Sequence, residues 1–115
     1  MKRNIFNFIC FFCLLMSSCK ICENEIKKSE NIDGYNKIVL FSRDAGATTG
    51  KSLQISIIPS TKELGDRKGN VCITDGTRLD YKIDGNNINI FYSGFLYLKK
   101  ERFGNYNVNY IALEQ

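Results

Sequence analysis

Apolar and polar residues alternate through most of this 115-residue chain, and this alternation constrains its fold more than any other feature. In SLQISIIP (52–59), leucine and isoleucine take every second position, the pattern of a strand buried on one face. Asp33-Gly34 and Asp84-Gly85 separate pairs of such runs and predict hairpin turns. No stretch beyond residue 22 has a helical period. We therefore expect an all-β domain, an antiparallel meander of about seven to eight short strands forming a sandwich or a half-open barrel.

Individual segments give finer expectations. KIVLFS (37–42) is apolar on both faces and predicts a central strand, whereas 52–59 predicts a half-buried strand with Ser52, Gln54 and Ser56 on its polar face. TKELGDRKGN (61–70) predicts a polar loop, and the turn at 103–105 predicts a last hairpin that closes the sheet. The aromatic residues expected to fill the interior are Phe41, Tyr81, Phe91, Phe95 and Tyr97.

The N-terminus has the three parts of an export signal. Lys2 and Arg3 precede an apolar run at 5–16, and twelve helical residues rise only about 18 Å, short of the roughly 30 Å hydrocarbon core. The ending Met16-Ser17-Ser18-Cys19 resembles a bacterial lipobox, in which a peptidase cuts before a diacylglyceryl-cysteine. Met16 departs from the leucine that lipoboxes prefer.

This resemblance implies a lipoprotein signal peptide at 1–18, an anchor and short linker at 19–23, and a single β domain at 24–115. Cys19 would carry the lipid, palmitate included, and hold an exported protein on a membrane of the cell envelope. An ordinary cleaved signal peptide and an uncleaved membrane anchor remain as alternatives.

Cysteine and histidine usage limits the chemistry. Of the five cysteines, Cys22 and Cys72 remain after the signal and the lipid site, and an oxidising compartment would allow them to pair. Alternatively, Cys72 is a small buried hydrophobe. The chain has no histidine, which excludes Ser-His and Cys-His catalysis and histidine metal sites, so we expect no enzyme, no metal and no cofactor. Asp66, Asp75 and Asp80 do not have the spacing of a calcium loop.

AGATTGKS (45–52) matches a loose phosphate-loop pattern, but its context argues against nucleotide binding. A phosphate loop leads into a helix whose N-terminus holds the phosphates, whereas an alternating strand pattern follows Lys51. Nucleic acid is also not expected, because the net charge of +4 falls to +2 without the signal segment and the basic residues are scattered.

The segment FSRDAGATTGKSLQISI (41–57) resembles a family of small bacterial secreted proteins and lipoproteins of unknown function. The family core runs Arg-Asp-Cys-Gly-Ala-Thr-Thr, followed by a strand of the type Ser-x-Gln-x-Ser-Ile. Ala45 replaces the family's cysteine, and Lys51 stands where many members carry an aromatic residue. The resemblance implies an exported β domain and supplies no mechanism.

These observations leave one candidate surface, a loop bearing Arg43, Asp44, Thr48 and Thr49. It is either a polar recognition patch or a hydrogen-bonded loop that keeps two strands in register. We expect a membrane-tethered, non-catalytic binding module, with the membrane and an envelope protein as partners. An immunity or inhibitor lipoprotein directed at an envelope toxin or hydrolase is the alternative, and an enzyme that uses carboxylates alone is a third class.

Overall fold

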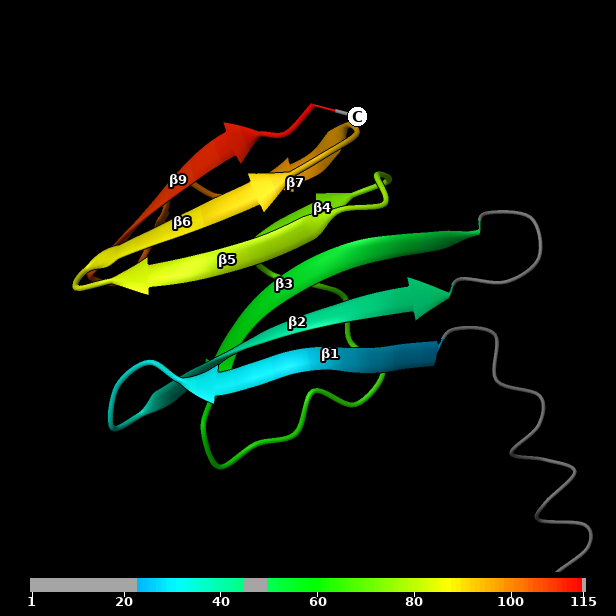
Figure 1. Ribbon diagram of the computed structural model, residues 1–115. Helices are drawn as coiled ribbons and strands as arrows, with labels where there is room; N and C mark the ends of the chain where they lie inside the picture. The colour runs from blue at the N-terminus through cyan, green and yellow to red at the C-terminus, as the bar shows by residue number, and fades with distance from the viewer. Residues whose placement is uncertain (1–22, 45–49, 115) are drawn as a thin grey trace, which may run out of the picture.

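The computed structural model describes residues 23–44 and 50–114, and these residues form nine strands and no helix (Figure 1). The strands are β1 (Glu23–Asn31), β2 (Asn36–Asp44), β3 (Lys51–Pro59), β4 (Cys72–Thr74), β5 (Leu79–Asp84), β6 (Asn87–Tyr92), β7 (Leu96–Lys99), β8 (Arg102–Phe103) and β9 (Tyr106–Ala112). The all-β prediction is confirmed. Within the described residues, no helix is long and apolar enough to cross a bilayer.

The strands form two sheets. Sheet A has the order β1-β2-β3-β4-β7 and sheet B the order β5-β6-β9-β8, and neither closes into a barrel. The main core draws on both sheets, which therefore pack face to face. Its buried members are Ile38, Leu40, Ile55, Ile57, Val71, Cys72, Leu79, Tyr81, Ile88, Ile90 and Val108.

Both predicted Asp-Gly hairpins are present. Between β1 and β2, Asp33 Oδ1 accepts hydrogen bonds from the backbone N–H groups of Tyr35 and Asn36, each 2.7 Å long. Between β5 and β6, Gly85 has a φ of 60°, a conformation that glycine adopts without steric cost.

The C-terminal strand departs from a simple meander. A turn at Gly104 joins β8 to β9 as a hairpin, but β9 also pairs in parallel with β6, from Asn87 opposite Asn107 to Tyr92 opposite Ala112. After β6 the chain crosses from sheet B to sheet A, where β7 pairs with β4. The chain then returns to sheet B, where β9 lies alongside β6.

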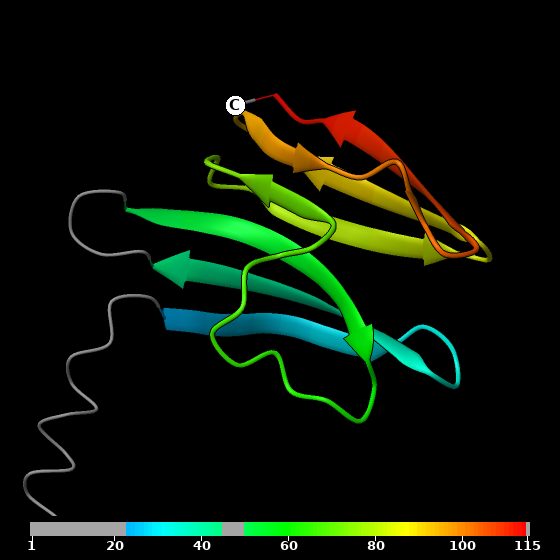
Figure 2. The same cartoon turned by 180° about the vertical axis from the view of Figure 1, so that it is seen from behind.

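Two crossings between the sheets lie side by side and interlock. One runs from β4 to β5 and the other from β6 to β7, and we call residues 74–78 and 93–95 the crossover clasp (Figures 1 and 2). Thr74 Oγ1 donates to the Ser93 carbonyl at 2.6 Å, the Arg78 N–H donates to Ser93 Oγ at 3.0 Å, and the Phe95 N–H donates to Asp75 Oδ1 at 2.8 Å. The clasp therefore joins the two sheets at one end of the molecule.

A second, smaller core lies on the outer face of sheet A. The segment between β3 and β4 crosses this face (Figure 2), and its Leu64 packs against Val39, Phe41 and Ile58. The central position predicted for 37–42 is confirmed, since β2 lies between β1 and β3 and is buried on both faces.

The prediction that β3 is half-buried is wrong. Gln54 and Ser56 are only 3% and 1% exposed, because the 60–71 segment covers the face that was expected to meet water. The aromatic prediction is also partly wrong. Phe41 and Tyr81 are buried, but Phe95 and Tyr97 remain 64% and 65% exposed on the outside of the molecule.

Candidate functional site

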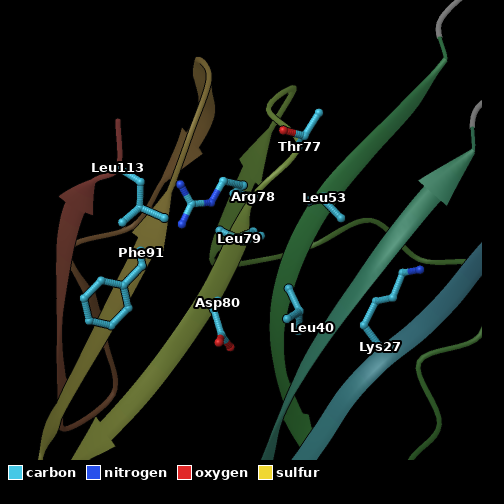
Figure 3. Close-up of a pocket in the computed structure, with 9 residues that line it drawn as sticks. All are labelled: Lys27, Leu40, Leu53, Thr77, Arg78, Leu79, Asp80, Phe91 and Leu113. Carbon is cyan, nitrogen blue, oxygen red and sulfur yellow. The ribbon is translucent and has the colours of Figure 1, made fainter. Parts of the chain in front are cut away.

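An open groove of about 560 Å³ runs along the edge of β5, and we call it the edge groove (Figure 3). Leu40, Leu53 and Lys27 of sheet A line one side, and Phe91 and Leu113 lie on the other (Figure 3). Thr77, Arg78, Leu79 and Asp80, at the start of β5 and just before it, complete the lining. The groove thus combines apolar walls with a few charged groups.

A bulge in β1 supplies one of these charges. Ile26 pairs with Phe41 and Lys28 pairs with Leu40, so Lys27 is an extra residue in the edge strand. Bulges of this kind change the direction of a side chain relative to a regular strand. Here Lys27 lines the groove, and its ammonium group is held by Glu25 Oε1 at 3.0 Å.

Lys28, next to the bulge, connects the two sheets. Its Nζ lies 3.2 Å from Asp80 Oδ1, 3.4 Å from the Tyr81 carbonyl and 4.2 Å from the centroid of the Tyr81 ring. Burial raises the pKa of the Tyr81 hydroxyl above its ordinary range, and the carboxylates of Glu30 and Asp80 add to this effect. Because Asp80 Oδ1 also accepts from the Tyr81 N–H at 2.8 Å, both backbone polar groups of Tyr81 at this edge have partners.

The second basic group of the groove, the Arg78 guanidinium, is held by the backbone of Glu114. Arg78 Nη1 donates to the Glu114 carbonyl at 3.1 Å, which places the guanidinium beside Leu113 (Figure 3). A second hollow, of about 270 Å³, shares Lys27, Leu53 and Thr77 with the edge groove. It extends the groove toward Ser42 and Lys51, where β2 ends and β3 begins.

Two of the four residues of the predicted recognition loop, Arg43 and Asp44, lie at the end of β2 within the described residues. Arg43 faces away from the groove, where its Nη1 donates to Asn24 Oδ1 at 3.0 Å and to the Asp66 carbonyl. Asn24 Nδ2 in turn donates to the carbonyls of Gly65 and Arg67. Arg43 therefore anchors the 60–71 segment on sheet A.

Asp44 lies on the other side of the same strand. It lines a small hollow of about 90 Å³ together with Glu23, Glu25 and Lys51. Thr48 and Thr49, the remaining members of the predicted loop, lie outside the described residues.

Two further residues of the family-like segment hold the same covering loop. Gln54 Oε1 accepts from the Gly69 N–H at 2.7 Å, and Ser56 Oγ accepts from the Asn70 N–H at 3.1 Å. The Asn70 side chain bonds both the N–H and the carbonyl of Ile57, each at 2.8 Å. The 60–71 loop is thus fixed on sheet A by three side chains, those of Arg43, Gln54 and Ser56.

The context of Lys51 differs from that of a phosphate-loop lysine. Lys51 is the first residue of a nine-residue strand that pairs with β2. The helix N-terminus that would hold phosphates is therefore not at this position.

Cys72 is a free thiol that is completely buried in the main core. Burial raises the pKa of this thiol to about 12. Its candidate disulfide partner Cys22, the lipidation site Cys19 and the signal segment 1–18 lie outside the described residues.

Over residues 23–44 and 50–114, no three cysteine, aspartate or glutamate side chains are grouped closely enough to hold a metal ion. The Asp75 carboxylate, for example, accepts from the Phe95 N–H through Oδ1 and from the Tyr97 hydroxyl through Oδ2. The other turn aspartate, Asp33, accepts from the Tyr106 hydroxyl at 2.8 Å.

The sequence did not indicate the edge groove, because its lining comes from six separate parts of the chain that meet only when the sheets pack. The bulge in β1 coincides in the sequence with two adjacent lysines, Lys27 and Lys28. No protein-family model, no curated protein and no solved structure matches this chain.

Proposed function

We propose that this chain is a membrane-tethered bacterial lipoprotein of the cell envelope, and that its β domain is a non-catalytic module that binds a partner in the edge groove. The groove is the observation that carries the binding role. Its volume of about 560 Å³ falls in the range of ligand sites, roughly 300–1,000 Å³, and such sites are mostly apolar with a few placed polar groups.

The lining of the groove favours an apolar side chain flanked by polar or charged groups. Leu40, Leu53 and Phe91 offer apolar contact, while Lys27, Arg78 and Asp80 supply both signs of charge within the same lining. A protein segment has this combination of groups, and an envelope protein is the partner class we propose.

The anchor is tested by metabolic labelling with a palmitate analogue. Wild-type protein should incorporate the label, and Cys19→Ser should not, because the diacylglyceryl group is attached to the Cys19 thiol. Equal labelling of the two proteins would contradict the lipoprotein assignment.

The binding role is tested by crosslinking in intact cells. A photoreactive amino acid placed at Thr77, an exposed residue that lines both hollows, should form a discrete adduct with an envelope protein. The matched control is Lys62, which is exposed on the loop that covers the outer face of sheet A. Identical adducts from both positions would show that the groove is not the binding surface. An adduct with a toxin or hydrolase would favour the alternative function, an immunity or inhibitor lipoprotein.

A further inference from the structure

Phe95 and Tyr97 form an exposed aromatic pair that no core contact explains. They are 64% and 65% exposed, and their rings meet edge to face with centroids 5.0 Å apart. Asp75 holds both residues, since its carboxylate accepts from the Phe95 N–H at 2.8 Å and from the Tyr97 hydroxyl at 3.2 Å. Two large side chains are therefore fixed in an outward position, where they lose little conformational freedom on meeting another surface.

Strand register places this pair at the same end of the molecule as the start of β1. Across sheet A, Glu23 pairs with Asp44 and Asp44 with Lys51. Two residues further along β3, Leu53 pairs with Thr74 and Thr74 with Leu96, at the start of β7. In Figure 1 the start of β1 and the crossover clasp both lie toward the right, and in Figure 2 they lie toward the left.

The proposed lipid site is only four residues before Glu23. A fully extended chain advances at most about 3.6 Å per residue, so the backbone of Glu23 lies within about 14 Å of Cys19. The end of the domain that carries the aromatic pair must then lie close to the membrane. The nine residues of β1 span about 30 Å, so the opposite end, with the β1–β2 turn, is held further away when the strands stand upright.

We propose that this end of the domain rests on the bilayer surface, with the rings of Phe95 and Tyr97 in the headgroup region. This inference rests on the anchor in the proposed function. Aromatic side chains favour the membrane–water interface, tyrosine especially, because it has an apolar ring and a polar tip. β7 is four strand spacings from β1, about 19 Å across the sheet, and a lipid surface is broad enough to reach both.

The experiment measures the lipid contact of matched positions in the lipidated protein. Phe95→Cys and Tyr35→Cys are made in a Cys22→Ser background and labelled with an environment-sensitive fluorophore, while the buried thiol of Cys72 is left unlabelled. Tyr35 is the control because it is an aromatic residue, 83% exposed, in the turn at the opposite end. Both proteins are placed in phosphatidylethanolamine–phosphatidylglycerol vesicles that contain a spin-labelled lipid as a quencher.

We expect several-fold stronger quenching at position 95 than at position 35. Equal quenching at the two positions, or stronger quenching at 35, would overturn the membrane-facing surface. Palmitate incorporation is measured in the same preparations, so a lipidated protein with equal quenching refutes the surface while the anchor stands. Absence of palmitate removes the tether and refutes both. Circular dichroism and unfolding midpoints that match the wild-type protein show that the variants fold.

Discussion

Replacement of Gly76 by alanine should destabilise the whole domain, because no space exists for a methyl group in the crossover clasp. A Cβ at this position would lie 2.0 Å from the carbonyl oxygen of Ser93 and 2.3 Å from its carbonyl carbon. An ordinary contact begins at 3.4 Å, so the two crossings would have to separate by about 1.4 Å. The obstructing atoms belong to the backbone and cannot rotate away.

The expected loss of stability follows from the strain and from the buried hydrogen bond that this separation breaks. The Ser93 carbonyl accepts from Thr74 Oγ1 at 2.6 Å, and both residues are buried, at 3% and 0% exposure. Overpacking costs about 1–3 kcal/mol and a buried group left without its partner about 1–3 kcal/mol, so we expect Gly76→Ala to lose roughly 2–6 kcal/mol. A domain of this size has a total stability of about 5–15 kcal/mol, so the loss is a large fraction of it.

Urea unfolding followed by far-UV circular dichroism measures this difference. The matched control is Gly34→Ala, the same chemical change in another turn, where a Cβ meets no atom within 4 Å and φ is not positive. We expect the control to stay within about 1 kcal/mol of wild type. If the two variants unfold within about 1 kcal/mol of each other, the clasp is not the rigid junction described above.

Three further outcomes are expected. Gln54→Leu should lose about 1–3 kcal/mol of unfolding free energy, because the buried Gly69 N–H loses its acceptor. Hydrogen exchange should accelerate at Gly69, and unchanged exchange would contradict the role of Gln54 in holding the loop. The Cys72 thiol, with its pKa raised to about 12, should resist thiol reagents at neutral pH until the protein unfolds, and rapid native labelling would contradict this. Hydrogen bonds from Tyr35, Tyr106 and Asn36 hold the pKa of Asp33 below its ordinary 3.8. Asp33 therefore stabilises the fold above about pH 4, and this contribution disappears as the pH falls through the lowered pKa. Asp33→Asn should lose less stability in acid urea titrations than wild type.

Local patterns were sufficient to predict the class of the fold and its hairpins. Alternation identified the strands, and Asp-Gly pairs identified the β1–β2 and β5–β6 turns, because these features depend on near neighbours in the chain. The parallel pairing of β6 with β9 left no such signal. It depends on the pairing of β7 with β4 in the other sheet, which is a contact between distant parts of the chain and not a pattern within one strand.

The same limit explains the errors at the candidate site. Gln54 and Ser56 have the polarity of a solvent-facing row, but their partners belong to a loop 12–15 residues further along the chain. Phe95 and Tyr97 were expected in the interior because hydrophobicity alone does not tell which side of a strand faces a second sheet. Arg43 was identified as a residue with specific contacts, and the structure shows these contacts to lie within the protein.

The parallel pairing of β9 has a consequence for how the chain acquires its structure. β9 lies between β6 and β8 in sheet B, so neither of these strands has its full set of partners until residues 106–112 are available. A polypeptide that emerges amino-terminus first, from a ribosome or from a translocation pore, can form the β1–β2–β3 ribbon early. Sheet B stays incomplete until residues 106–112 have been released. A truncation that removes β9 should leave β8 without a partner and β6 paired with β5 alone.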